Sequence, residues 1–317
     1  MSVKILVNGS TAYDVLLGYD GSFADAIDPS ALDALSVSFF APHYARHHGG
    51  TGANIAWNLN LLGIDPMLVT TIGTDGGDYR TLLEDRGISV EHVEQLTSGA
   101  TATAIIGTDS SERQITFFHP GADAHGSFPD LSEEREDISH AIISPRNAVL
   151  MMEGVRWCDK YKVPYLFDPG QQVIALSDDE LRFGTEHSAG VIANEYEWGL
   201  ISSRLNITEE NALLKTQMVI VTQGESGVTC FCEEGALNIG PCTPDQVVNP
   251  TGAGDAFRAG LLAGMQADWS RIDTLRLGNA LGSLAVEIEG TLIDHVDCDA
   301  VWSRAEIAYG EKLPNLS

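Results

Sequence analysis

Strand-like and helix-like segments alternate through the second half of this chain, and that alternation limits its fold more than any other feature. The segments with a strand-like apolar pattern are His140–Ser144, Tyr165–Asp168, Val191–Asn194 and Met218–Thr222. Helical stretches lie between them, and the last two helices are expected at about Ala253–Gln266 and Ile272–Ile288. Alternation of this kind is typical of a mostly parallel sheet covered by helices. We therefore predict an α/β fold, and the length favours one large domain over residues 1–317.

Two stretches, at about residues 15–48 and 91–123, do not follow this alternation. In the second stretch, Thr101–Gly107 and Gln114–Phe118 have strand-like patterns and are joined through a polar turn without a helix. The first stretch contains the strand candidate Leu35–Phe40. We predict that the two stretches pair as a small sheet outside the main domain.

The charge of the chain is strongly negative. Eighteen Lys and Arg residues against 45 Asp and Glu residues give a formal net charge of −27, and only five of the basic residues are Lys. This balance excludes a non-specific nucleic-acid binder, because neutralising phosphates requires clustered Lys and Arg. An acidic excess is screened in concentrated salt. The composition therefore favours adaptation to high salt, with an ordinary acidic enzyme as the alternative.

Targeting and redox signals favour a cytoplasmic location. No stretch approaches the ~18 consecutive apolar residues of a membrane span, and polar residues interrupt the first residues where a signal peptide would need an apolar core. The five cysteines are odd in number and form no CxxC pair, which argues against a disulfide framework or a zinc site. We expect a soluble protein of the reducing cytoplasm that binds no membrane.

The strongest chemical signal is the glycine-rich segment Asn249–Phe257, which opens an apolar helix. Glycines at a helix start let a ligand approach the backbone, and the unpaired N–H groups there attract anions. Asp255 falls in the first turn, beside any bound anion. A carboxylate that accepts a hydroxyl proton next to such amides is the minimum apparatus for phosphoryl transfer. The alternative is a glycine turn in which Asp255 only stabilises the helix dipole.

Two other phosphate-binding motifs are absent from the sequence. It contains no Gly-Lys dipeptide, which excludes a GxxxxGK[ST] P-loop. Its Gly-x-Gly segments, at 50–52 and 252–254, lack the third glycine of a GxGxxG motif. The sequence therefore supports neither a P-loop ATPase nor a Rossmann dehydrogenase.

A second glycine-rich cluster, residues 49–54, also precedes a helical pattern. Gly49 and Gly50 would bring the backbone against a polyhydroxylated ligand, and the amide of Asn54 offers both a donor and an acceptor. A plain loop-to-helix turn is the alternative. Asp14 lies just beyond the first strand, where α/β sheets bind ligands, although a single loop Asp is as readily solvated or capping.

Three further strand ends carry polar residues, at 168–171, 194–197 and 222–227. Asn194 and Glu197 can share a metal–phosphate site through water, and they fit a helix capping box equally well. The 222–227 loop either lines a nucleotide pocket or forms only a turn. On the strand candidate Gln114–Phe118, Phe117 and Phe118 either stack on a base or pack against neighbours.

Together these motifs resemble the ribokinase-like (PfkB) family of sugar and nucleoside kinases. They occur in the family's order over nearly the whole chain, at residues 8–14, 49–54, 194–197, 222–227 and 249–257. Finer features are similar to the microbial nucleoside (adenosine-like) kinase branch, at residues 49–56, 115–122, 167–171 and 250–262, the last including Arg258.

The resemblance implies a three-layer α/β/α sandwich with a small β lid that closes over the acceptor. It implies that Asp255 is the general base and that the amides of Gly252, Ala253 and Gly254 form an anion hole. The residues implied to bind the substrate are Asp14, Gly49, Gly50, Asn54, Phe117, Asp168 and Gln171, with Phe118 beside Phe117 over the base. The residues implied to border ATP are Asn194, Thr222, Gly224, Gly227 and Asn279. Glu197 would organise Mg²⁺ through water.

The reaction implied is transfer of the γ-phosphate of ATP to the 5′-hydroxyl of a ribonucleoside, adenosine or another purine nucleoside, by a monomer or homodimer. A sugar kinase of the same family, acting on ribose, fructose or a sugar acid, is the alternative, and a non-catalytic nucleoside-binding protein is the rival from another class. The family often has Asp in place of Asn249, in a loop associated with a monovalent cation. Asn249 weakens the expectation of K⁺ activation, although the carbonyl groups of the loop can still bind a cation.

Overall fold

Strands make up two sheets in the computed structural model, which describes residues 3–27, 36–295 and 297–316. The strands of the large sheet are β1 (Lys4–Asn8), β4 (Pro66–Ile72), β5 (Val93–Gln95), β8 (Ile138–Ile143), β9 (Tyr165–Phe167), β10 (Gly190–Asn194), β11 (Met218–Thr222), β12 (Val228–Cys232) and β13 (Gly235–Ile239). The strands of the small sheet are β2 (Ala12–Gly18), β3 (His43–Gly49), β6 (Ala102–Thr108) and β7 (Gln114–His119).

The large sheet is mostly parallel. Over the described residues it has nine strands in the order β13-β12-β11-β10-β9-β8-β1-β4-β5. The strands from β11 to β5 pair in parallel, and β12 and β13 extend the sheet antiparallel at one edge. The predicted α/β fold with a mostly parallel sheet is confirmed.

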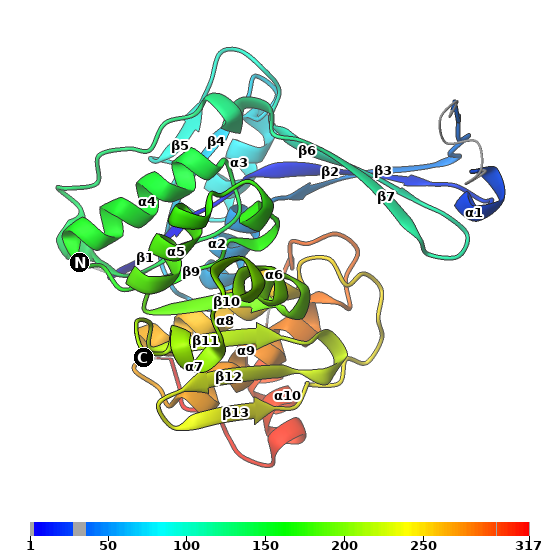
Figure 1. The fold of residues 1–317 in the computed structure, drawn as a ribbon. Coiled ribbons are helices and arrows are strands. Elements are labelled where there is room, and N and C mark those ends of the chain that lie inside the picture. Colours follow the sequence, from blue (N-terminus) through cyan, green and yellow to red (C-terminus); the bar gives the residue numbers. More distant parts are fainter. Residues whose placement is uncertain (1–2, 28–35, 296, 317) are drawn as a thin grey trace.

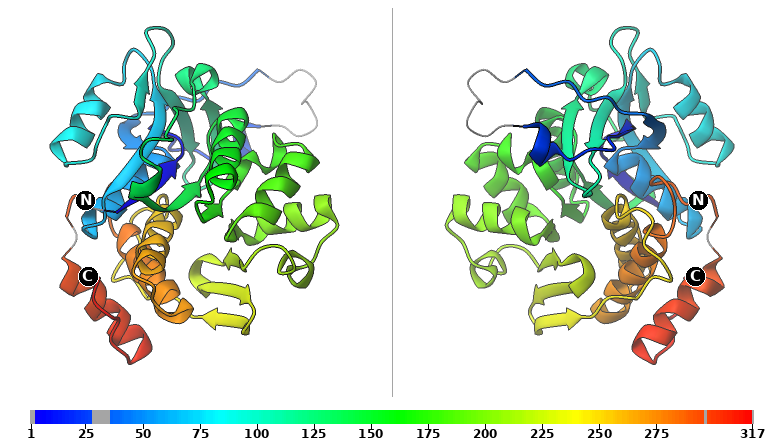
Figure 2. Two further views of the ribbon diagram at one scale, coloured as in Figure 1. Left: turned by 90° about the vertical axis from the view of Figure 1, so that its left-hand side faces the viewer. Right: turned by 90° about the vertical axis from the view of Figure 1, so that its right-hand side faces the viewer.

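Helices cover both faces of this sheet (Figures 1 and 2). The longer helices are α2 (Thr51–Leu61), α3 (Gly77–Asp85), α4 (Ala148–Tyr161), α5 (Asp178–His187), α6 (Glu195–Leu205), α8 (Ala253–Gln266), α9 (Arg271–Ala285) and α10 (Cys298–Tyr309). Short helical turns are α1 (Phe23–Ala26), α7 (Glu209–Ala212), η2 (Gly121–His125), η3 (Arg135–Asp137), η4 (Gly170–Ile174) and η5 (Gly224–Ser226).

The sheet separates two apolar cores. Because side chains alternate along a strand, Ile5 and Val7 of β1 pack into one core while Leu6 packs into the other. The first core is completed by α2, α3, α8, α9 and α10, and the second by α4, α5 and α6. This is the predicted arrangement of three layers.

The predicted small sheet is present, and it extends away from the main body with α1 at its outer end (Figure 1). Strand β2 pairs in parallel with β6, while β3 and β7 flank them antiparallel. One predicted strand is wrong. Residues 36–40 form no strand, and Leu35 lies outside the described residues; the pairing strand is β3, whose polar pattern at His43–Gly49 does not resemble a buried strand. None of the described helices is long and apolar enough to cross a membrane.

Candidate active site

Helices α2 and α8 begin at the edge of the large sheet where its parallel strands have their carboxyl ends. The start of α2 lies against Gly9, which follows β1, and Arg258 of α8 contacts Asp168, which follows β9. Asp168 directly follows β9, and Asn194 at the end of β10 pairs with Thr222 at the end of β11. Carboxyl ends of parallel strands are where open α/β sheets bind ligands. Most of the residues singled out in the sequence lie along this edge.

Helix α8 begins directly after Gly252, at the glycine-rich segment where the sequence predicts a helix start. Gly252 is its N-cap with a φ of 88°, and Asp255 lies in its first turn. The Asn54 Nδ2 group, from α2, donates a hydrogen bond of 2.7 Å to Oδ2 of Asp255. Burial raises the pKa of Asp255 to about 6, although Arg258 and the Asn54 hydrogen bond act to lower it. A half-buried carboxylate whose pKa is raised toward neutrality is suited to work as a general base.

Asn54 is itself held in place from its other side. Oγ1 of Thr291 lies 3.0 Å from Oδ1 of Asn54 and 3.0 Å from the carbonyl of His48. Gly50 caps α2, and its carbonyl accepts the amide of Asn54 at 2.9 Å. The buried amide of Asn54 therefore has a fixed orientation, which directs its NH₂ group to Asp255.

Asp14 reaches the same region from β2. The Cβ of a side chain at position 49 would lie 2.3 Å from Oδ2 of Asp14, so only glycine leaves room for this carboxylate. Burial raises the pKa of Asp14 to about 6, and the opposing His47 lowers it. Asp14 in turn acts to raise the pKa of Asp255, which places the two carboxylates within electrostatic range of each other.

Asp168, which the resemblance assigns to the substrate, forms a buried ion pair. Its side chain is 0% exposed, and both of its oxygens accept from Arg258, Oδ2 from Nε at 2.5 Å and Oδ1 from Nη2 at 2.7 Å. In the structure Asp168 is therefore the ion-pair partner of Arg258, and its implied contact with the substrate stays a prediction.

Both interpretations of Asn194 and Glu197 fit the structure. The two residues form a reciprocal capping box at the start of α6, in which Oε2 of Glu197 accepts from the Asn194 amide at 2.9 Å. Burial raises the pKa of Glu197, Asp168 acts in the same direction, and Arg258 opposes it. Mg²⁺ is usually held by one or two carboxylates together with waters and phosphate oxygens. One half-buried carboxylate at this edge fits such a water-mediated site.

The residues expected to border ATP lie at the β11–β13 end of the edge. Thr222 ends β11, Gly224 lies in η5, and the buried Gly227 has a φ of 93° just before β12. A Cβ at position 227 would lie 2.2 Å from the carbonyl oxygen of Ile239, beside Gly240. From α9, Nδ2 of Asn279 donates to the carbonyl of Gly240 at 2.9 Å. Gly227 and Asn279 therefore converge on one short segment after β13.

The register of the small sheet distinguishes the two phenylalanines of β7. Asp14 pairs with His47 and with Ala104, and Ala104 pairs with Phe118. Residues in one row share a face of the sheet, so Phe118 is on the face of Asp14. Phe117 belongs to the next row and therefore to the opposite face. The register therefore favours Phe118 over Phe117 as the aromatic residue on the side of Asp14.

Gln171 is the remaining residue implied to bind substrate. It is exposed in η4, three residues after Asp168, and the described hydrogen bonds do not join it to the other site residues.

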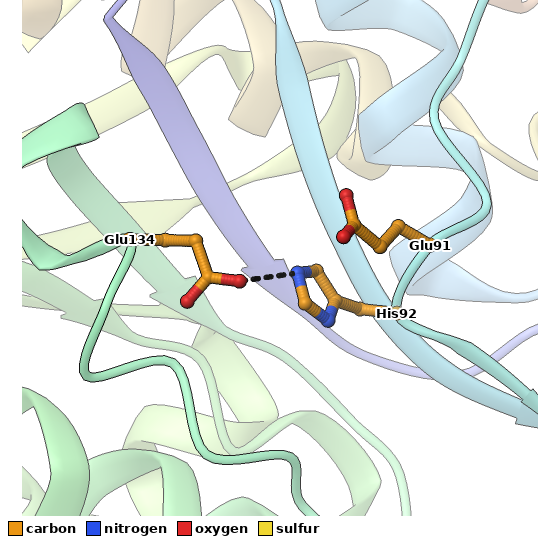
Figure 3. A group of neighbouring side chains, drawn as sticks. All are labelled: Glu91, His92 and Glu134. Atoms are coloured by element: carbon orange, nitrogen blue, oxygen red, sulfur yellow. Dashed lines mark ion pairs between the residues drawn. The ribbon is translucent and has the colours of Figure 1, made fainter.

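A separate group of possible metal ligands, Glu91, His92 and Glu134, lies elsewhere (Figure 3). Nε2 of His92 is 3.5 Å from Oε1 of Glu134. His92 directly precedes β5 and Glu134 lies shortly before β8, so this group is at the amino ends of the strands. It has no part in the edge described above, and an ordinary ion pair accounts for its closest contact.

Comparison with known proteins identifies the family. The sequence profile described as pfkB family carbohydrate kinase matches residues 21–297. The chain belongs to the pfkB family. The structure of a nucleoside kinase from Burkholderia thailandensis in complex with inosine is 32% identical, with a TM-score of 0.89 over 98% of this chain and 99% of that chain. The same enzyme in complex with ADP-inosine is 33% identical, with a TM-score of 0.87 over 99% and 98% of the chains.

A curated relative agrees with these structures. The nucleoside kinase of Methanocaldococcus jannaschii is 27% identical over 273 residues, which cover 86% of this chain and 89% of that protein. Membership of the pfkB family confirms the predicted ribokinase-like fold, and these relatives confirm the resemblance to its nucleoside kinase branch. The protein is a phosphotransferase that acts on an alcohol group.

Sequence reasoning missed three residues of this pfkB site. Arg258 appeared only as a mark of the branch, and the sequence patterns assigned no role to His47 or Thr291. A signal for Arg258 was available, because an arginine within an apolar helical run, three residues after Asp255, implies a buried anionic partner. No local pattern marks Thr291, which reaches Asn54 across 237 residues of sequence.

Proposed function

We propose that this kinase transfers the γ-phosphate of ATP to the 5′-hydroxyl of a ribonucleoside, with adenosine or another purine nucleoside as the acceptor. The observation that carries the proposal is the half-buried Asp255 in the first turn of α8, which accepts a hydrogen bond from Asn54. The similarity to a nucleoside kinase whose structures contain inosine and ADP-inosine supports a purine nucleoside as the acceptor.

In the proposed reaction, Asp255 accepts the proton of the acceptor hydroxyl. The hydroxyl oxygen then forms a bond to the γ-phosphorus, and the bond between that phosphorus and the β–γ bridging oxygen breaks, so that ADP leaves with the bonding electron pair. The amides of Gly252, Ala253 and Gly254 donate to the oxygens of the transferred group, because a helix start leaves its first N–H groups without intrahelical partners. For Ala253 this donation replaces a long bond of 3.4 Å to the carbonyl of Pro250.

The other residues of the edge bind and orient the two substrates. We assign Asp14, Gly49, Gly50 and Asn54 to the ribose hydroxyls, and Phe118 to the face of the base. The ATP side comprises Asn194, Thr222, Gly224, Gly227 and Asn279. In this arrangement the small sheet acts as a lid over the nucleoside and excludes water, which limits wasteful hydrolysis of ATP.

Glu197 would hold Mg²⁺ through water, with the cap bond to Asn194 fixing one of its oxygens. When bound, Mg²⁺ would neutralise part of the phosphate charge. A monovalent cation such as K⁺ is a further candidate ligand of the loop around Asn249, whose side chain accepts from the amide of Thr251 at 3.0 Å. Comparing KCl with tetramethylammonium chloride at equal ionic strength tests that cation directly.

The test of the proposed function is ADP release from Mg-ATP in high KCl, across a panel of ribonucleosides and free sugars. We expect turnover on purine ribonucleosides. We expect Asp255→Asn to lower kcat by ~10²–10⁴-fold, the usual worth of a general base, while binding of the nucleoside, followed by calorimetry, is retained. Turnover on sugars alone would move the acceptor to the sugar-kinase alternative. Binding without turnover by the wild-type protein would favour the non-catalytic rival, and full activity of Asp255→Asn would remove Asp255 as the base.

A further inference from the structure

Arg258 lies beneath the start of α8, at the centre of a group of carboxylates. It follows Asp255 by three residues, and positions three apart on a helix are neighbours on its surface. Its side chain is 11% exposed. Arg258 acts to lower the pKa of both Asp255 and Glu197, so its charge is within electrostatic range of the proposed base and of the proposed Mg²⁺ ligand.

The guanidinium group of Arg258 is held from one side only. Nε and Nη2 donate to the two oxygens of Asp168, which fixes the plane of the group through a bidentate pair. Burial acts to lower the pKa of Arg258, but the ion pair with Asp168 outweighs this and raises it, so the group is always charged. Within the described residues, Nη1 takes no part in that pair, and its two N–H groups are free to bind a ligand.

The position of Nη1 is marked by Gly254. A Cβ on residue 254 would lie 2.8 Å from Nη1 of Arg258. The nitrogen is therefore next to Gly254, the last residue of the Gly252–Gly254 segment, whose amides face a bound anion in the proposed reaction. Glycine at position 254 leaves open the space between the helix backbone and this nitrogen.

We propose that Arg258 is a catalytic residue whose Nη1 donates hydrogen bonds to the phosphoryl group being transferred, while Asp168 positions it. This assignment rests on the proposed phosphoryl-transfer site at the start of α8. Transfer of a phosphoryl group spreads negative charge over its oxygens, and a fixed arginine at that point stabilises the charge as it develops. The pair with Asp168 makes the donor rigid, because a planar guanidinium held at two nitrogens leaves the third in a defined place.

The proposal explains why the chain keeps a buried ion pair here. A buried pair contributes little net stability compared with apolar residues of similar volume, so its presence under a ligand-binding helix start calls for a chemical reason. The carboxylates of Asp168, Asp255 and Glu197 all lie within electrostatic range of Arg258, and without it they would repel a phosphate of ATP. Arg258 offsets part of that repulsion at the position of the transferred phosphoryl group.

The test compares two double variants that each neutralise one buried ion pair. Arg258→Gln with Asp168→Asn removes the proposed donor without leaving a lone buried charge. Arg146→Gln with Asp123→Asn does the same to a pair that is equally buried and lies outside the proposed site. We expect the first double variant to lose ~10²-fold or more in kcat, with little change in the KM of the nucleoside. The control should lose thermal stability but keep kcat within about twofold.

Chemical rescue separates a catalytic role from a structural one. In Arg258→Ala, free guanidinium can occupy the vacated place beside Asp168, so added guanidinium chloride should restore part of the turnover, whereas KCl at the same concentration should not. The Arg258→Gln/Asp168→Asn variant has no charge to hold the ion and should show no rescue. A kcat close to that of the control pair, or an equal response to guanidinium and K⁺, would overturn the proposal.

A binding measurement decides the matter even if no acceptor on the panel is turned over. Arg258 touches the terminal phosphoryl group and not ADP, so its removal should weaken binding of a non-hydrolysable ATP analogue more than binding of ADP. An unchanged preference between the two nucleotides in a folded, turnover-inactive protein would count against the role of Arg258. Loss of that preference would support it, although the acceptor would then have to be sought outside nucleosides and sugars.

Discussion

Two half-buried carboxylates of the proposed acceptor site, Asp14 and Asp255, predict a steep loss of activity in acid. Burial raises the pKa of both Asp14 and Asp255 to about 6. In the proposed reaction, Asp255 must be ionised to accept a proton, and an ionised Asp14 accepts the ribose hydroxyls. Activity should therefore be present above about pH 6 and fall as the pH decreases through that value.

The magnitude follows from the two ionisations. A carboxyl group with a pKa of about 6 is only about one-tenth ionised at about pH 5, so two such groups together leave about one molecule in a hundred in the active form. We therefore expect kcat/KM for the nucleoside to fall ~100-fold from about pH 8 to about pH 5, with a limiting slope of 2 on a logarithmic plot, because kcat/KM reports groups of the free enzyme.

Asp14→Asn is the matched variant for this measurement. It removes one ionisation, so the slope should fall to 1 and the loss at about pH 5 to ~10-fold. Its midpoint should also shift to lower pH, because Asp14 acts to raise the pKa of Asp255. Protonation of ATP affects both proteins equally and so cancels in the comparison. Equal slopes for the wild-type and variant enzymes would refute the assignment of Asp14 as a titrating substrate ligand.

Three further outcomes are expected. Gly254→Ala should reduce kcat strongly, because the new Cβ would lie 2.8 Å from Nη1 of Arg258. The control Gly199→Ala, on α6 with open space around it, should leave kcat unchanged. Equal kcat values for the two variants would place the phosphate elsewhere. Phe118→Ala should raise the nucleoside KM roughly tenfold or more, because stacking on a base is worth ~1–3 kcal/mol. Phe117→Ala should change that KM little. A larger KM increase in Phe117→Ala than in Phe118→Ala would place the base on the Phe117 face of the small sheet. Raising KCl from about 0.1 M to about 2 M should raise the melting temperature measured by circular dichroism, because salt screens the repulsion of a chain with a net charge of −27; a lower melting temperature would contradict salt adaptation.

The fold was largely predictable because the parallel strands are buried, and a buried strand is recognisable in the sequence as a short apolar run. Strands β9 to β11 are apolar on both faces, as strands in the middle of a layered sheet must be, and the glycines before α8 mark its start. The small sheet shows the opposite case. Strand β3 contains three histidines and an arginine, and exposed polar strands have no apolar alternation to reveal them. The apolar Leu35–Phe40 was therefore the more strand-like segment by pattern, and the prediction there was wrong.

The candidate site was predictable where a residue's role depends on its neighbours in sequence. It was not predictable where the role depends on a contact with a residue distant in sequence. The segment around Asp255 has a local physical meaning at a helix start, and the structure brings Asn54 to it. Whether Phe117 or Phe118 faces the acceptor depends on the register of β2, β6 and β7, which pairs residues about ninety positions apart in sequence. The partner of Asp168 depends in the same way on where α8 crosses the end of β9. Strand ends carry polar residues for both ligand binding and internal pairing, and only the three-dimensional arrangement distinguishes the two.

The capping box of α6 shows that a structural role and a chemical role need not compete. The cap uses Oε2 of Glu197, which accepts from the amide of Asn194, and a carboxylate has a second oxygen with its own lone pairs. Fixing one oxygen by a backbone bond fixes the direction of the other, so the cap orients Glu197 for a water-mediated contact with a cation. Glu197→Gln keeps an oxygen for the cap but removes the charge. It should therefore leave the melting temperature nearly unchanged while raising the Mg²⁺ concentration needed for half-maximal activity, and a variant that loses stability without any change in that Mg²⁺ requirement would reduce Glu197 to a cap.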